Sequence, residues 1–234
     1  MERSCVDCLN QNCLIKKNIT NPKVQEFAER KRTMNLQKGK DIVVEGTNVQ
    51  GLFFIYDGIV NVYKTGINGK EQVLRFSKSG EVIGYRGFGS NDQYQIGAEC
   101  MSDAVMCFFS NAILEEMFLT IPQVTYDFMR FYAEELGRSE TKVQKFAQMT
   151  VREKVIDTLL YMHRKFGETN GYLNLQLSRK EIAGYAGTTN EQVIRVITAL
   201  EKEGIVEKKV KRIVIKDLDS LKKEITENNF FLSS

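Results

Sequence analysis

The sequence contains one histidine, His163, and this scarcity limits the chemistry that the chain can support. A single histidine leaves little room for histidine-based catalysis or for a metal site built from histidines. The sequence also contains no nucleophile elbow, phosphate-binding loop or dinucleotide-binding fingerprint. We therefore expect a protein that is not an enzyme.

Long apolar stretches are absent as well. No window of about 18 residues is apolar enough to predict a transmembrane helix, and the N-terminal residues lack the apolar core of a secretory signal. We therefore expect a cytoplasmic protein without a membrane partner. In that compartment, the five cysteines are expected to be thiols or metal ligands rather than disulfides.

The composition is that of an ordinary globular chain, and its length suggests two domains. Of the 234 residues, 42% are hydrophobic and 27% are charged. Residues 1–149 carry 18 basic and 18 acidic side chains, whereas residues 150–234 carry 15 and 12. The excess of positive charge therefore lies at the C-terminal end, where a polyanion would bind. The excess is small, and a solvated face with a chance imbalance is the alternative explanation.

Residues 33–110 consist of short runs rich in β-branched and aromatic residues, such as L-F-F-I-Y and I-V-N-V-Y-K, separated by glycine-containing turns. Their close spacing leaves no room for crossover helices. This pattern predicts an α+β chain whose first domain is a small antiparallel β-barrel or jelly roll of the cupin-like kind. We assign residues 21–120 to this effector or sensor domain and residues 1–20 to a cysteine-bearing tail.

A long helix is predicted over residues 121–148, because Pro122 can occupy its first turn and the helical pattern continues to about Gln148. Apolar side chains recur along it at intervals of three, four or seven: Phe128, Tyr132, Leu136, Val143 and Phe146. The stripe could pack on the barrel of its own chain or against a second copy. Because the helix is too long for a barrel of this size, we predict that it forms a dimer.

The remaining residues predict a DNA-binding module. Ser178 and Glu181 have the spacing of a capping box, and Gly187 is placed to end the helix that they begin. A second helix follows, with apolar positions Val193, Ile194, Ile197 and Leu200. The run I-V-E-K-K-V-K-R-I-V-I then predicts a β-hairpin. Two helices joined by a glycine turn and followed by a two-stranded wing predict a winged helix-turn-helix over residues 149–234.

With these motifs, the chain resembles the CRP/FNR family of bacterial transcription regulators over nearly its whole length. The segment L-S-R-K-E-I-A-G-Y-A-G-T-T-N-E-Q-V-I-R-V-I-T-A-L-E-K-E-G-I-V is similar to the helix-turn-helix of the family, and G-E-V-I-G, residues 80–84, is similar to its effector-domain turn. The resemblance implies a homodimer that binds a palindromic DNA operator and has RNA polymerase as a further partner. The alternative is an effector-binding protein whose winged helix contacts another protein.

Base contacts are expected from one face of the second helix. Its N-terminal half, which enters the major groove in such modules, carries Asn190, Glu191, Ile194 and Arg195. An arginine can bond to guanine O6 and N7, and a carboxylate can accept from cytosine N4. The resemblance implies that Glu191 and Arg195 recognise a G-A step within each half-site of the operator. Asn190 and Ile194 differ from the residues that are commonest at these positions in the family. Alternatively, Glu191 completes a capping box with Thr188 or forms an ion pair with Arg195.

Phosphate contacts would position the module without specifying a sequence. The candidates are the neighbouring basic and hydroxyl side chains: Arg179, Lys180, Thr188, Thr189, Lys208, Lys209, Lys211 and Arg212.

The resemblance also locates an effector pocket, which would comprise Gly80, Glu81, Gly84, Tyr85, Arg86 and Tyr94. Cyclic-nucleotide binding in this family uses a glutamate for the ribose and an arginine with a neighbouring hydroxyl for the cyclic phosphate. Tyr85 replaces the glutamate, and Y-Q-I-G, residues 94–97, replaces the arginine and hydroxyl pair. We therefore expect no cyclic AMP binding. Arg86 is a remaining cation in this pocket, so binding of another anionic ligand stays an alternative.

The cysteines offer a different sensor. Cys5, Cys8 and Cys13 form C-x2-C-x4-C, and Cys107 matches the fourth cluster cysteine of the FNR branch. Four thiolates suit a [4Fe-4S] cluster, which would respond to oxygen or nitric oxide, or a zinc ion. The second interval is shorter than is usual in that branch, and Cys100 is an alternative fourth ligand. Ordinary thiols, with Cys107 as a small buried apolar residue, are the remaining interpretation.

Overall fold

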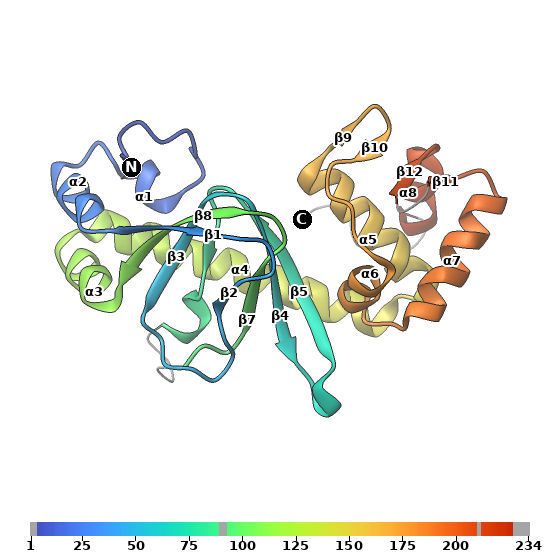
Figure 1. Ribbon diagram of the computed structural model, residues 1–234, viewed down its shortest axis with the longest axis horizontal. Coiled ribbons are helices and arrows are strands. Elements are labelled where there is room, and N and C mark those ends of the chain that lie inside the picture. Colours follow the sequence, from blue (N-terminus) through green and yellow to red (C-terminus); the bar gives the residue numbers. More distant parts are fainter. Residues whose placement is uncertain (1–3, 89–92, 210–211, 227–234) are drawn as a thin grey trace. The chain divides into compact units, whose positions relative to one another are not determined.

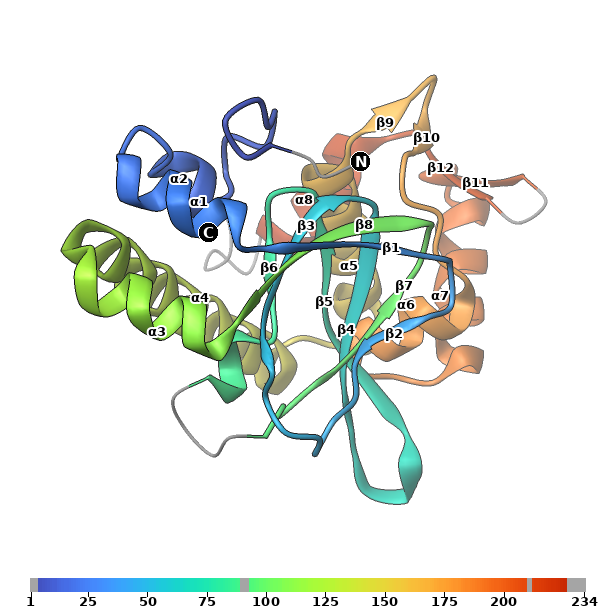
Figure 2. The same ribbon diagram turned by 60° about the vertical axis from the view of Figure 1, so that its left-hand side comes forward.

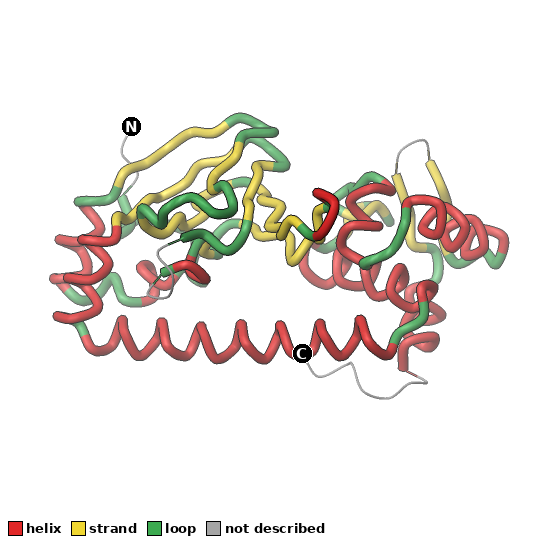
Figure 3. Tube along the Cα trace, turned by 90° about the horizontal axis from the view of Figure 1, so that it is seen from below, coloured by secondary structure: helices red, strands yellow, loops and turns green. Residues whose placement is uncertain are grey.

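The computed structural model describes residues 4–88, 93–209 and 212–226, and the chain divides into two compact units, Met1–Glu135 and Leu136–Ser234 (Figure 1). The division falls inside helix α4 (Pro122–Gln148), a continuous helix of 27 residues (Figure 3). It precedes residue 149, where the sequence suggested a domain boundary. The reason is that the last turns of α4 pack with the C-terminal unit, where Lys145 Nζ lies 2.8 Å from Asp157 Oδ1.

The N-terminal unit contains the predicted antiparallel β-barrel, built as two four-stranded sheets. One sheet has the order β1-β8-β3-β6, with β1 (Arg32–Leu36), β8 (Ala104–Ser110), β3 (Gly51–Asp57) and β6 (Val82–Ile83). The other has the order β2-β7-β4-β5, with β2 (Asp41–Val43), β7 (Gly97–Cys100), β4 (Ile59–Thr65) and β5 (Glu71–Lys78). Side chains from both sheets form a common core that includes Ile55, Val60, Ala98 and Met106. The alternation of apolar residues along each strand determines which side chains enter it.

Helices cover the opposite face of the sheet that contains β1, β8 and β3 (Figure 2). They are α1 (Leu14–Lys17), α2 (Pro22–Glu29), α3 (Asn111–Thr120) and the first turns of α4. Ile15 of α1, Phe109 of β8 and Val124 of α4 belong to one buried cluster on this side. A hydrogen bond of 2.9 Å from Asn18 Nδ2 to Asp127 Oδ2 also joins the N-terminal segment to α4.

The C-terminal unit contains the predicted winged helix-turn-helix. After α5 (Val151–Phe166), a small sheet has the order β11-β12-β10-β9, and α8 (Leu218–Thr226) packs on α5. The strands of this sheet are β9 (Glu168–Thr169), β10 (Tyr172–Leu173), β11 (Val206–Lys209) and β12 (Arg212–Ile215). Among the described residues, no helix combines the length and the apolar character that a membrane crossing requires.

The local sequence determines the start and the end of the first helix of the motif, α6 (Arg179–Ala186). Ser178 and Glu181 form the predicted capping box, and Gly187 ends the helix in the left-handed conformation at φ 64°. This conformation favours glycine and lets α7 (Asn190–Lys202) begin at once. The side chain of Thr189 caps α7 by accepting from the amide of Gln192. The alternative capping box between Thr188 and Glu191 is therefore wrong.

Candidate DNA-binding and sensor sites

Helix α7 presents the four candidate base-reading side chains to solvent. Its buried ridge, which consists of Val193, Ile197 and Leu200, faces the core of the C-terminal unit. The helical period then leaves the remaining positions of its first turns outside: Asn190, Glu191, Ile194 and Arg195 are all exposed. Ile194 retains 47% of its accessible surface, although an isoleucine gains free energy from burial.

The candidate phosphate-binding residues differ in their surroundings. Lys180 and Thr189 are exposed at the start of α6 and α7. Arg179 is half-buried, and this burial lowers its pKa, but an arginine stays charged in proteins. Thr188 is buried and its hydroxyl bonds to Gln192 Oε1, so its side chain supports the turn and is not available to a phosphate.

The wing carries basic side chains whose charges are partly balanced. Lys208 Nζ lies 2.6 Å from Glu201 Oε2, and Lys209 Nζ lies 3.5 Å from Glu207 Oε1. Arg212 is exposed, with its guanidinium 5.6 Å from the centre of the Tyr172 ring. Lys211 lies outside the described residues. The acidic partners reduce the attraction that the wing offers to a phosphate backbone.

The expected effector pocket is occupied by side chains of the N-terminal unit itself. Tyr85 is only 2% exposed, and its hydroxyl donates a hydrogen bond to Glu135 Oε2. Arg75 Nη1 lies 2.5 Å from the same carboxylate oxygen and 2.8 Å from the Tyr85 hydroxyl. Burial, the largest effect, raises the pKa of Tyr85, so the phenol stays protonated and remains a donor. Sequence reasoning did not identify Arg75 or Glu135 as parts of this site.

Tyr94 closes the pocket from the other side. Its hydroxyl donates to the carbonyl of Gly51 over 2.9 Å and accepts from the amide of Gln50 over 3.1 Å. Gly84 has a φ of +91°, and a Cβ there would lie 2.9 Å from Tyr94 Cε1. The remaining space is a small cavity beside Arg75 and Arg86. The expected effector pocket is therefore filled by two tyrosines and an internal ion pair.

Gly80 was expected in the effector pocket, but it lies against the N-terminal tail. A Cβ at this position would lie 3.5 Å from Asn12 Cβ and 3.6 Å from the amide of Cys13, so the turn lies directly against the cysteine-bearing tail. The tail is also tied to β3, because Asn10 Nδ2 donates to the carbonyl of Tyr56 over 2.7 Å.

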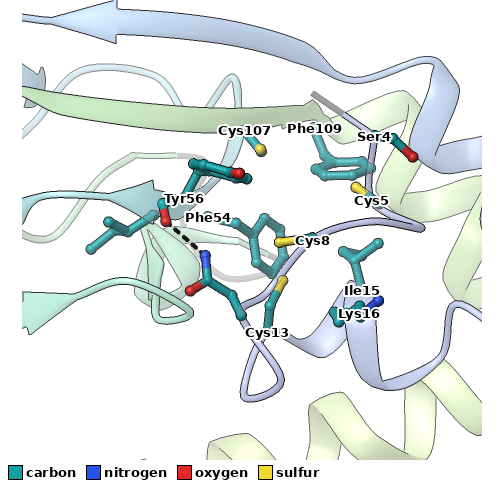
Figure 4. Close-up of a pocket in the computed structure, with 12 residues that line it drawn as sticks. Ser4, Cys5, Cys8, Cys13, Ile15, Lys16, Phe54, Tyr56, Cys107 and Phe109 are labelled. Atoms are coloured by element: carbon teal, nitrogen blue, oxygen red, sulfur yellow. Dashed lines mark hydrogen bonds between the residues drawn. The ribbon is translucent and has the colours of Figure 1, made fainter. Parts of the chain in front are cut away.

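Four cysteines that are distant in sequence line one pocket on the helix-covered side of the sheet. Cys5, Cys8, Cys13 and Cys107 share it with the apolar side chains of Ile15, Phe54 and Phe109 (Figure 4). Cys107 is brought there by β8, and the other three are brought there by the tail. Cys100, the alternative fourth ligand, is buried in the core between the two sheets, so that alternative is wrong.

Burial raises the pKa of three thiols of this pocket, those of Cys5, Cys13 and Cys107. Desolvation raises the pKa of Cys13 to about 11 and that of Cys107 to about 12. Within the described ranges, no three histidine, cysteine or acidic side chains are arranged to hold a metal ion. A tetrahedral zinc ion would require all sulfurs at about 2.3 Å from one point. Four cysteine thiols are also the donor set that a four-iron cluster uses.

The predicted dimer stripe divides between two faces of α4. Phe128 is buried and stacks on Phe118 at 4.7 Å, and the Tyr132 hydroxyl bonds to the carbonyl of Tyr85. Both side chains therefore pack within their own unit, a correction that follows from the aromatic cluster beneath α4. Phe146 is half-buried beside Lys142.

The exposed apolar face of α4 contains the other two predicted residues. Leu136 and Val143 are 62% and 68% exposed, and Tyr126 and Met129 are 53% and 59% exposed. We call these four residues the α4 stripe. Their spacing of three and then seven residues is that of a coiled-coil seam.

Comparison with known proteins identifies both units. The Crp-like helix-turn-helix domain matches residues 153–224, and the cyclic nucleotide-binding domain matches residues 33–120. The chain is 27% identical over 198 residues to Electron transport regulator A of Shewanella oneidensis, covering 83% of this chain and 78% of the relative. It is 25% identical over 190 residues to the transcriptional activator protein FnrA of Stutzerimonas stutzeri, covering 80% and 78%.

Solved structures agree in fold. FixK2 from Bradyrhizobium japonicum matches with a TM-score of 0.73 and 25% identity, over 82% of this chain and 96% of that chain. The c-di-GMP-responsive regulator CLP of Xanthomonas campestris matches with a TM-score of 0.74 and 20% identity, over 82% and 97%. These relatives are transcription regulators rather than enzymes, and they do not favour a winged helix that serves only protein contacts. The chain belongs to the CRP/FNR family of DNA-binding transcription regulators.

Proposed function

We propose that this regulator reads a palindromic operator through Asn190, Glu191, Ile194 and Arg195. The observation that carries the proposal is the exposure of all four side chains on the first turns of α7 while the opposite ridge is buried. Lys180 and Thr189 are placed to contact the flanking phosphates. Binding of the protein to a selected palindrome and to random duplex, measured over a range of salt concentrations, tests it. Equal affinities for both duplexes would contradict the proposal.

The operator-binding form is a homodimer joined through the α4 stripe. Two half-sites one helical turn apart require two recognition helices, and a symmetric pair of α4 helices supplies them. The exposed apolar side chains of the stripe support this arrangement because water contact at these positions costs free energy. RNA polymerase is the further partner that we propose for the DNA-bound dimer, because the relative FnrA is named a transcriptional activator.

The signal is a redox signal received by a [4Fe-4S] cluster on Cys5, Cys8, Cys13 and Cys107. Support comes from the convergence of four thiols on one pocket and from relatives such as the Anaerobic regulatory protein of Pasteurella multocida, 23% identical over 223 residues. A bound cluster would supply reactivity towards oxygen or nitric oxide. The filled nucleotide site supports the same conclusion, because it leaves cyclic AMP without a place to bind.

The route from the cysteine pocket to the dimer helix runs through α1. Ile15 lines the pocket, and it lies in the same buried cluster as Val124 and Phe128 of α4. The hydrogen bond from Asn18 to Asp127 adds a polar link between the two helices. Ordering of the tail by its cysteines would therefore stabilise the position of α4, and release of the tail would weaken it.

Anaerobic reconstitution with iron and sulfide tests the cluster. The parent protein should gain a brown colour, a visible absorption band and stoichiometric iron and sulfide. Cys8→Ala and Cys107→Ala should lose them, whereas Cys100→Ala, a buried cysteine outside the pocket, is the matched control and should keep them. A colourless parent protein that binds its operator equally well in air would contradict the cluster and show that the cysteines are ordinary thiols.

A further inference from the structure

Two polar side chains outside the lining of the cysteine pocket lie beside its cysteines: Lys31, which directly precedes β1, and Thr33 of β1. Thr33 is the direct antiparallel partner of Cys107, so the two side chains project from the same face of the sheet. Phe54 on β3 is the partner of Cys107 on its other side, and it also lines the pocket. Lys31 precedes β1, and its ammonium lies near the Cys5 thiol.

Lys31 is a buried cation, with 9% of its surface exposed. Its ammonium donates to the carbonyl of Ala28 over 3.3 Å and bonds to the Cys5 thiol, and its charge lowers the pKa of both Cys5 and Cys107 against the larger effect of desolvation. Lysine is rarely buried without a partner of opposite charge. A negative charge in the pocket would therefore stabilise the buried ammonium of Lys31.

Thr33 has a buried hydroxyl oxygen without a hydrogen-bond partner in the described part of the chain. Leaving such a group unpaired is costly in a folded protein. Its nearest cross-strand neighbour is Cys107, whose sulfur becomes a hydrogen-bond acceptor when it is a thiolate. A ligating sulfur at Cys107 would satisfy this hydroxyl.

We propose that Lys31 and Thr33 are positioning residues that stabilise the negative charge of the cluster, Lys31 beside Cys5 and Thr33 beside Cys107. The inference rests on the proposed cluster. Four thiolates make the bound assembly anionic, and the rest of the lining is mostly apolar. Hydrogen bonds and positive charge near the sulfurs raise the reduction potential of such clusters and make them harder to oxidise.

The test uses the full chain reconstituted under nitrogen, with Lys31→Met, Lys31→Arg and Thr33→Val compared with the parent. Lys17→Met is the matched control, because Lys17 is exposed on α1 and the change removes the same charge. The readouts are iron and sulfide content, the midpoint potential of the cluster, and the rate at which its visible absorbance decays in air. Circular dichroism checks that each variant folds.

We expect Lys31→Met and Thr33→Val to shift the midpoint potential to more negative values and to bleach several-fold faster in air. Lys31→Arg should remain close to the parent, and Lys17→Met should match it. A parent protein that takes up no cluster overturns the proposed redox function and this inference together. A parent that binds a cluster, with Lys31→Met and Thr33→Val indistinguishable from Lys17→Met, overturns the inference alone. If Lys31→Met does not fold, the comparison of Thr33→Val with the parent decides.

Discussion

The hydroxyl of Tyr85 donates a hydrogen bond to the carboxylate of Glu135, which joins the β-barrel to the middle of α4 within the N-terminal unit. The family resemblance predicts that Tyr85 replaces the glutamate that holds the ribose of a cyclic nucleotide. Arg75 completes the contact by pairing with the same carboxylate. The chain therefore supplies from α4 the carboxylate that pairs with Arg75 and Tyr85.

The first prediction concerns the stability of this contact. Glu135→Ala would remove the anionic partner of the mostly buried Arg75 guanidinium, and breaking a buried pair in this way costs about 3–5 kcal/mol. Urea unfolding of the variant should show this loss. Glu115→Ala, at an exposed position on α3, is the control and should change stability by no more than about 0.5 kcal/mol. A similar midpoint for both variants would mean that the ion pair contributes nothing.

A second prediction follows from the same filled pocket. Cyclic AMP should neither raise the melting temperature of the protein nor change its affinity for DNA, because the phosphate arginine and the ribose carboxylate are replaced by tyrosines that bond to the barrel and to α4. Isothermal titration with cyclic AMP up to millimolar concentration checks this. A saturable binding isotherm would show that Tyr85 and Tyr94 can move aside.

The contrast between Tyr85 and Glu135 shows what the sequence could and could not predict. The replacement of the nucleotide-binding residues was visible in the local motif. The partner of Tyr85 was not, because Arg75 and Glu135 are 60 residues apart and Glu135 is a polar residue on a helix whose expected core stripe was apolar. Local patterns describe which face of a strand or helix is buried, but not which distant charge meets it.

The same limit explains the dimer helix. A period near 3.5 residues predicted one apolar stripe on α4, whereas the helix has an inner face with Phe128 and Tyr132 and an outer face with Leu136 and Val143. A helix with one buried apolar face and a second, exposed apolar face carries two stripes, and their residues interleave in sequence. By contrast, the caps at Ser178, Glu181 and Gly187 are local, and the helix-turn-helix was predicted to within a residue or two.

The α4 stripe gives a third prediction. Leu136→Glu should place a charge in the dimer seam and convert the protein to a monomer at micromolar concentration, with loss of operator binding because one half-site holds only one recognition helix. Gln144→Glu adds the same charge at an exposed position outside the stripe and should remain dimeric. Sedimentation velocity separates the two states. A dimeric Leu136→Glu variant would place the interface elsewhere.

A fourth prediction separates base contacts from phosphate contacts. Arg195→Ala should lose about 1–3 kcal/mol on the operator and little on random duplex, because it removes a base contact. Lys180→Ala, at an exposed position on α6, should weaken binding to both duplexes alike and reduce the slope of log affinity against log salt by about 1 for each protomer bound. Equal losses of Arg195→Ala on both duplexes would reassign that arginine to the backbone. Lys211, which the sequence also suggested as a phosphate contact, is expected to behave like Lys180.

The last prediction assigns a base to Ile194. This side chain is 47% exposed between Glu191 and Arg195 on the reading face of α7, and an apolar group in the major groove can recognise the C5-methyl group of thymine. Replacing thymine by uracil in the operator removes only that methyl group. At one position of a single half-site, the replacement should cost the parent protein about 0.8 kcal/mol, roughly a fourfold loss of affinity. Ile194→Ala should bind the thymine and uracil operators equally well, while Arg195→Ala should keep the difference. If every uracil operator weakens the parent and Ile194→Ala by the same factor, the isoleucine does not touch a thymine methyl group, because the two changes would then be independent.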